Sequence, residues 1–69
     1  MTGNPQAELA YRANDGLEVS LFWSSKCRRL TVVVSDERVG HAFELTAHPE
    51  NALDVFHHPY AYAALQGII

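Results

Sequence analysis

Apolar residues recur at every second position in four successive short segments, and this alternation constrains the fold more than any other feature. In residues 17–24 the alternating apolar side chains are Leu17, Val19, Leu21 and Trp23. The same period of two is present in three further segments, residues 8–12, 30–35 and 41–46. Because successive side chains of a β-strand point to opposite faces, the sequence predicts four strands, each with one buried face.

Short turn signals separate these segments. Asn14-Asp15-Gly16 favours a hairpin, because Gly16 tolerates the positive φ that tight turns require. Residues 25–28 form a polar and basic connection without glycine, proline or asparagine, so they specify no particular turn type. Residues 36–40, which end at Gly40, form the third turn. Consecutive strands joined by such short turns are typical of an antiparallel meander.

Closing the hairpins on these turns predicts the register, because directly opposite residues of an antiparallel pair share a face. The predicted pairs of the first hairpin are Tyr11–Val19, Leu9–Leu21 and, on the other face, Arg12–Glu18. Those of the second are Trp23–Leu30, Leu21–Val32 and Val19–Val34, and those of the third are Val32–Phe43 and Leu30–Leu45. This register places the large apolar side chains on one face, which a slip of one residue would reverse.

The C-terminal part of the chain has a helical pattern. Pro49-Glu50-Asn51 suits a first helical turn capped by His48 or Thr46. The apolar side of this helix is predicted to be Ala52, Leu53, Val55 and Phe56. Pro59 cannot continue the helix without losing a backbone hydrogen bond, so a break follows His57 or His58. A second short turn over residues 60–66 then ends at Gly67.

These elements predict one small α+β domain over residues 8–69, after a disordered tail of residues 1–7. The domain is a four-stranded antiparallel β-meander with a C-terminal α-helix packed on one face. Burial of Trp23, Phe43, Phe56 and the leucine and valine side chains is expected to supply most of its stability.

The cysteine content and the charge bear on location and partners. Cys27 is the single cysteine, whereas small secreted domains usually need disulfides. The chain begins without the basic and apolar regions of a signal peptide and has no run near the roughly 20 apolar residues that span a bilayer. We therefore expect a cytoplasmic protein without membrane contact. The net charge of -3 argues against a general nucleic-acid surface.

One candidate ligand-binding site lies near the C-terminus and comprises His57, His58, Tyr60 and Tyr62. Adjacent helical residues point about 100° apart, so the two histidines are poorly placed to chelate one ion. The chain also lacks the H-x-x-x-H spacing of helical metal ligands, and we predict neither a metal site nor a cofactor. Alternatively, the histidines simply end the helix, where a partly cationic imidazole suits the negative end of the dipole.

A second set of candidates concerns partner binding. Lys26, Arg28 and Arg29 form a basic turn that either meets a phosphate or an acidic partner or remains a solvated turn. Cys27 lies within it, but no Cys–His signature accompanies this thiol, so a surface thiol is expected rather than a nucleophile. The outward stripe of Phe22, Val33 and Ala42 is either a set of isolated surface hydrophobes or a dimer or partner contact.

Two resemblances add to this interpretation. The segments RLTVVVSDERVGHAFEL and ALDVFHHPYAYAA resemble those of small actinobacterial proteins of unknown function, a resemblance that implies no activity. The order of three strands and a helix is also similar to AP2-type DNA-binding domains, which read DNA with sheet residues that are largely arginine, lysine and tryptophan. The outward positions here are neutral or acidic, with Glu18, Thr31 and Glu44 among them, which departs from that pattern.

The sequence therefore predicts a protein without catalytic activity, since it lacks a glycine-rich phosphate loop, a nucleophile elbow and a Walker pattern. The leading hypothesis is a protein-interaction or accessory module that binds a protein partner or a second copy of itself. One alternative is nucleic-acid binding through the five cations Arg12, Lys26, Arg28, Arg29 and Arg38. The other is a metal or small ligand bound near the C-terminal histidines.

Overall fold

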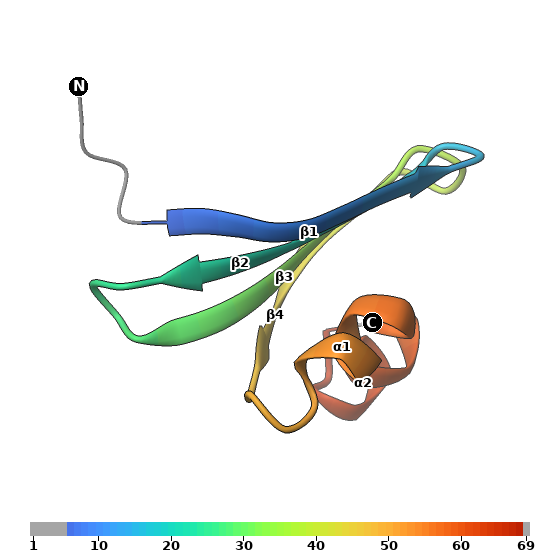
Figure 1. Ribbon diagram of the computed structural model, residues 1–69. Helices are drawn as coiled ribbons and strands as arrows, with labels where there is room; N and C mark the ends of the chain where they lie inside the picture. Colours follow the sequence, from blue (N-terminus) through green and yellow to red (C-terminus); the bar gives the residue numbers. More distant parts are fainter. Residues whose placement is uncertain (1–5, 69) are drawn as a thin grey trace.

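The four predicted strands form a single antiparallel sheet in the order β1-β2-β3-β4 in the computed structural model of the protein (Figure 1). The structure describes residues 6–68. The elements, in chain order, are β1 (Gln6–Asn14), β2 (Leu17–Ser24), β3 (Arg29–Asp36), β4 (His41–Ala47), α1 (Ala52–His57) and α2 (Pro59–Leu65). The predicted α+β class and the meander are confirmed.

The chain enters the sheet earlier than the sequence predicts. Residues 1–5 of the predicted N-terminal tail lie outside the described residues. Gln6 and Ala7 belong to β1, where they pair with Ser24 and Trp23 of β2. Strand β1 therefore runs alongside the whole of β2.

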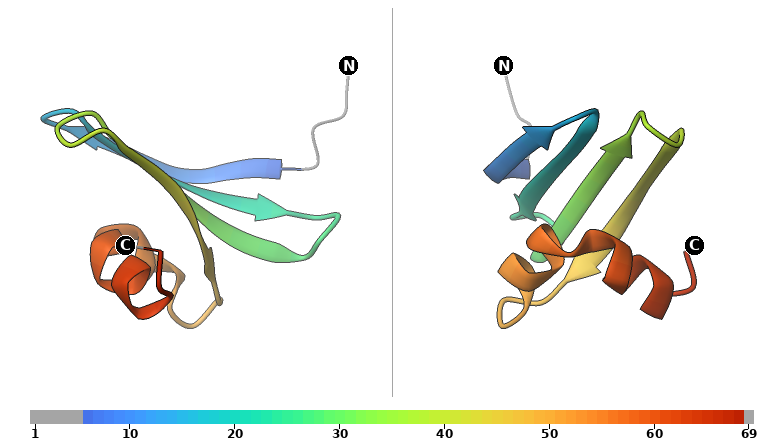
Figure 2. Two further views of the ribbon diagram at one scale, coloured as in Figure 1. Left: turned by 180° about the vertical axis from the view of Figure 1, so that it is seen from behind. Right: turned by 90° about the vertical axis from the view of Figure 1, so that its right-hand side faces the viewer.

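Both helices lie on the same side of the sheet, and no other described segment covers the opposite side (Figure 2). Helix α1 packs against β2, β3 and β4, and α2 packs against β4. Neither helix in residues 6–68 is long and apolar enough to cross a membrane. One face of the sheet is therefore a core face, and we call the other the outer face.

The predicted break at Pro59 separates the two helices. The His58 N–H donates the last hydrogen bond of α1 to the Asp54 carbonyl, and Pro59 is the first residue of α2. Gly67 follows α2 with a φ of 75°, as expected for a glycine cap. The predicted cap at His48 or Thr46 is wrong, because α1 begins only at Ala52 and its N-cap residue is Asn51, which makes no capping side-chain bond.

The core lies between α1 and the central strands. Its most deeply buried large side chains are Val19, Val32, Val34, Leu45 and Val55. The prediction for Leu53 is wrong, because this side chain is 63% exposed. Positions 52, 55 and 56 form the inward stripe of this short helix, and position 53 points about 100° away from Ala52. Trp23 and Phe43 are only partly buried, at the margin of the core.

The predicted register of the first hairpin is wrong by one residue. Asn14 pairs with Leu17 across a two-residue turn, in which Asp15 and Gly16 have φ values of 52° and 86°. Positive φ at both positions is typical of a type I′ turn, whose twist matches that of the strands. The observed pairs are Arg12–Val19, Tyr11–Ser20, Ala10–Leu21 and Ala13–Glu18.

This shift reverses the faces of residues 10–14 of β1, whereas the bulge at Leu9 returns residues 6–8 to the predicted register. Leu9 and Tyr11, predicted to be in the core, are 56% and 54% exposed, and the pairing shifts between Glu8 and Ala10. Arg12 points to the core face instead of pairing with Glu18. Its guanidinium donates to the carbonyl of Phe56 at 3.0 and 3.3 Å and lies 5.5 Å from the centre of the Phe56 ring.

The second hairpin has the predicted register, and the third is shifted by two residues. Observed pairs of β3 and β4 are Val32–Leu45, Val34–Phe43 and Leu30–Ala47, and Val33 lies opposite Glu44. The loop spans residues 37–40, and Asp36 pairs with His41. A shift of two residues preserves every face, so the large apolar side chains of β3 and β4 remain on the core side.

Candidate functional site

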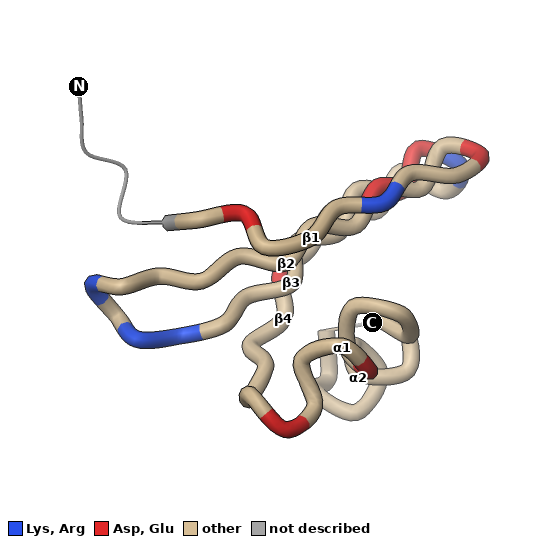
Figure 3. Tube along the Cα trace, viewed as in Figure 1, with Lys and Arg blue, Asp and Glu red and all other residues tan. Residues whose placement is uncertain are grey.

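The basic turn between β2 and β3 is held by its own backbone and by Ser24. The buried Ser24 hydroxyl accepts a hydrogen bond from the Cys27 N–H at 3.2 Å, and Arg28 has a φ of 55°. A residue with a Cβ rarely adopts this left-handed conformation. The turn therefore presents Lys26, Arg28 and Arg29 at an exposed end of the sheet, as Figure 3 shows.

The other two cations of the chain have structural partners. Arg12 donates to the carbonyls at the end of α1, and Arg38 forms a salt bridge of 2.8 Å with Asp36. Within residues 6–68, no carboxylate lies within 4.0 Å of the cationic groups of Lys26, Arg28 or Arg29. The three cations of the turn are therefore free to bind an anion.

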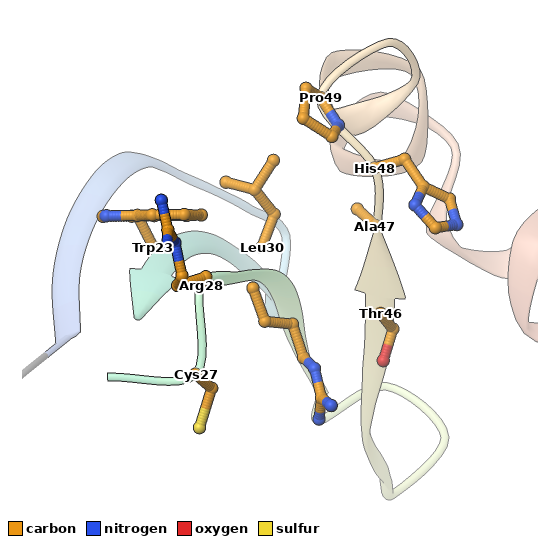
Figure 4. A pocket seen from close by; sticks show the side chains of 9 residues that line it. Trp23, Cys27, Arg28, Leu30, Thr46, Ala47, His48 and Pro49 are labelled. Carbon is orange, nitrogen blue, oxygen red and sulfur yellow. The ribbon is translucent and has the colours of Figure 1, made fainter. Parts of the chain in front are cut away.

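A cleft of about 520 Å³ lies beside this turn, and we call it the tip cleft. Its lining residues are Trp23, Cys27, Arg28, Arg29, Leu30, Thr46, Ala47, His48 and Pro49. It is open because α1 begins only at Ala52 and covers the sheet further from this end. Figure 4 shows Trp23, Arg28 and Leu30 on one side of the cleft, and Ala47 and Pro49 on the other.

The lining combines an apolar surface with positive charge. Trp23 pairs with Leu30 across β2 and β3, and Leu30 pairs with Ala47 across β3 and β4. These three side chains form a continuous apolar floor, and two arginines border it. Among the residues that the structure describes, no aspartate or glutamate lines the cleft. Such a site suits a ligand that carries both an apolar group and a carboxylate or phosphate.

The predicted outward stripe lies on the outer face as expected. Phe22 and Val33 are half-buried by their neighbours, and Ala42 is exposed. The one-residue shift of β1 adds Tyr11, which lies opposite Ser20 and is exposed. Sequence reasoning missed this residue because it placed Tyr11 in the core.

The predicted C-terminal ligand site does not converge on one point. The Tyr60 hydroxyl donates to Asp36 at 2.6 Å, whereas the Tyr62 hydroxyl donates to Asp54. The His57 ring packs edge-on against the Phe56 ring.

His58 lies near the end of α1, with its Nε2 atom 4.0 Å from Asp54. Tyr60 therefore joins α2 to β3 and Tyr62 joins α2 to α1, whereas these contacts of His57 and His58 are with residues of α1 itself. In the described part of the chain, no three His, Cys, Asp or Glu side chains are grouped to hold a metal ion.

The network around Asp36 changes proton affinities. Hydrogen bonds from Arg38, and then from Tyr60, hold the pKa of Asp36 well below its usual range. The same bond to Asp36, with some burial, raises the pKa of Tyr60 above its ordinary value. The bond to Asp54 raises the pKa of Tyr62 in the same way. These shifts mark stabilising contacts between α2, β3 and α1.

Comparison with known proteins identifies no relative. No family model matches the chain, and no similar curated protein or solved structure was found. The tip cleft and the outer face are therefore interpreted from the geometry of this chain alone.

Proposed function

We propose that this protein is a non-catalytic interaction module whose tip cleft binds an acidic segment of a partner protein. The observation that carries the proposal is a set of three cations that lie next to an apolar cleft and form no ion pair within residues 6–68, in a chain whose other two cations are bound internally. A reducing cytoplasm suits the module, because the exposed Cys27 remains a thiol there.

The chemistry of the cleft defines the segment. Arginine guanidinium groups bind carboxylates through two parallel hydrogen bonds, and Arg28 and Arg29 both border the cleft. Trp23 and Leu30 offer an apolar surface to an aromatic or aliphatic side chain. A partly exposed tryptophan and an arginine are also the residue types enriched among energetically dominant interface residues. The expected ligand therefore carries an apolar side chain flanked by aspartates or glutamates.

Nucleic-acid binding is less compatible with this geometry. The five cations of the chain do not form one surface, since Arg12 and Arg38 are engaged far from the β2–β3 turn. A net charge of -3 further disfavours a polyanion. An acidic peptide needs only the local positive charge of the turn.

The only tryptophan of the chain lines the cleft, so its fluorescence reports binding directly. The probe is a tryptophan-free peptide with one phenylalanine flanked by glutamates, and the matched control peptide has lysines in their place. We expect a saturable change in Trp23 emission with the acidic peptide and no change with the control peptide. Arg28→Gln should raise its Kd about tenfold, or ~1.4 kcal/mol. Glu37→Gln, which changes an exposed charge outside the cleft, should leave the Kd unchanged.

Two results would overturn the proposal. One is an acidic peptide that leaves both the emission and the indole N–H resonance of Trp23 unchanged at millimolar concentration. The other is a single-stranded oligonucleotide that binds with a steep salt dependence while the acidic peptide does not, which would establish nucleic-acid binding instead.

A further inference from the structure

The outer face carries Phe22 and Val33 on its two central strands, Glu8 and Glu44 on its edge strands, and Glu18 and Arg29 towards opposite ends of the sheet. The strand pairing places outward residues in rows across the sheet. One central row is Tyr11, Ser20, Val33 and Glu44, and the next is Glu8, Phe22, Thr31 and Thr46. Towards one end lies Glu18, which is exposed, and towards the other lies Arg29, which is also exposed.

We propose that two copies of this chain pack outer face against outer face, with opposite ends together. The occupant of the face is thus a second copy, related to the first by a two-fold axis in the plane between the two sheets. The proposal shares Arg29 with the tip cleft, but Trp23 and Leu30 of that cleft lie on the core face of each copy.

Electrostatics selects the direction of this axis. An axis parallel to the strands would bring the two Arg29 side chains to the same end and the two Glu18 side chains to the other. An axis across the strands, at the level of Leu21 and Val32, places Glu18 of each copy near Arg29 of the other. The axis across the strands is favoured, because it brings opposite charges together at both ends. The axis parallel to the strands is disfavoured, because it brings like charges together.

The whole molecule shows the same polarity. The basic turn lies at one end of the sheet, and the turns that contain Asp15, Glu37 and Arg38 lie together at the other (Figure 3). Arg38 is paired with Asp36 there, so acidic residues are in excess at this end. The Glu37 N–H donates to the Gly16 carbonyl at 2.9 Å, which fixes these two turns side by side. Antiparallel stacking therefore also brings each basic end close to an acidic end.

Side-chain sizes also match in this arrangement. The axis across the strands stacks Phe22 of each copy over Ser20 of the other, and Val33 over Thr31. A large side chain thus meets a smaller one at each contact, which lets two sheets interdigitate at their usual separation of about 10 Å. Tyr11 lies beside Ser20 in the same row and extends the apolar contact around Phe22.

The size of the face predicts a reversible dimer. Strands of about 25 Å at spacings of about 4.8 Å give a sheet face of roughly 500 Å². Two such faces bury roughly 1,000 Å², which is near the lower limit for a specific interface. We therefore expect a dimer that dissociates on dilution.

Sedimentation equilibrium of the full chain, from about 10 µM to about 1 mM, measures this association. We expect a monomer–dimer equilibrium in the parent protein. Phe22→Ser removes the central contact and should raise the dissociation constant at least about tenfold. Circular dichroism should show that each variant is folded.

A charge exchange tests the arrangement itself. Glu18→Arg and Arg29→Glu should each weaken the dimer about tenfold, and the double variant should restore it. Glu50→Arg, which makes the same charge change outside the sheet, should have no effect.

A folded parent protein that stays monomeric at about 1 mM would overturn the proposal. Single variants that weaken association without restoration in the double variant would also overturn it, because opposite ends would then not be in contact.

Discussion

Arg28 and Gly40 occupy the last position of two hairpin loops of equal length, and both have a positive φ, 55° and 71°. Glycine adopts this conformation without steric cost, whereas a residue with a Cβ loses roughly 1–2 kcal/mol. The chain therefore has an arginine where glycine would be more stable. Backbone strain of this kind is concentrated at functional sites, and Arg28 borders the tip cleft.

Replacing Arg28 should change the stability of the protein and its affinity for the acidic peptide in opposite directions. We expect Arg28→Gly to raise the free energy of unfolding by roughly 0.5–1 kcal/mol, because relief of strain exceeds the added entropy of the unfolded chain. The same variant should lose affinity for the acidic peptide. Urea titration measures the first effect and Trp23 fluorescence the second.

The matched control is Gly40→Ala. An added Cβ at Gly40 meets no atom within 4 Å, so the expected loss of about 1 kcal/mol is due to the backbone conformation alone. An Arg28→Gly variant less stable than the parent would show that the Arg28 side chain stabilises the turn by more than its strain.

Two leucines provide a test of where the core lies. Leu45 is 1% exposed beneath the helices, whereas Leu53 of α1 is 63% exposed. We expect Leu45→Ala to lower the free energy of unfolding by about 2–5 kcal/mol, and Leu53→Ala by less than about 0.5 kcal/mol. Urea midpoints of the two variants measure the difference. Similar losses would contradict the packing of α1.

The alternation of apolar residues predicted most of the sheet correctly. In β3 this alternation is enough to assign which side chains lie on the core face. Val32 and Val34 lie on the core face in any register shifted by an even number of residues. The error of two residues in the third hairpin therefore changed partners but no faces. The error of one residue in the first hairpin reversed residues 10–14 of β1, because Asn14 pairs with Leu17 instead of lying in the turn.

The sites were less predictable because they depend on long-range contacts. Lys26, Arg28 and Arg29 were identified from sequence as a basic turn. The sequence could not show which of the five cations have internal partners. Only the fold brings Arg12 next to the Phe56 carbonyl and Arg38 next to the Asp36 carboxylate. The tip cleft depends on where α1 begins relative to the end of the sheet, and no local pattern specifies that relation.

Arg12 joins β1 to the end of α1, and its removal should loosen both. Its guanidinium donates to the carbonyls of Phe56 and His57, which end the helix without further helical partners. We expect Arg12→Ala to lower the free energy of unfolding by about 1–2 kcal/mol. Hydrogen exchange of α1 amides should accelerate. Arg29→Ala removes the same charge without these bonds and should leave stability nearly unchanged.

The carboxyl of Asp36 and the hydroxyl of Tyr60 should limit stability at opposite extremes of pH. The folded pKa of Asp36 lies below the value near 3.9 of an unfolded chain, chiefly because of its hydrogen bond from Arg38. At pH below about 4 the unfolded chain binds protons first, so the contribution is lost as pH falls through the folded pKa.

The folded pKa of Tyr60 is raised, so its contribution is complete below about pH 10 and is lost as pH rises through the folded pKa. Urea titrations across pH should show that Asp36→Asn flattens the decline in acid, while Tyr60→Phe flattens the decline in alkali. Tyr62→Phe is a control for the acid range alone, since its hydroxyl bonds Asp54 and not Asp36, while its own raised pKa should make this variant flatten the alkaline decline as well. If Asp36→Asn left the acid slope unchanged, other carboxylates would govern the acid transition, and the bonds between Asp36 and its two partners would contribute little to the folded state.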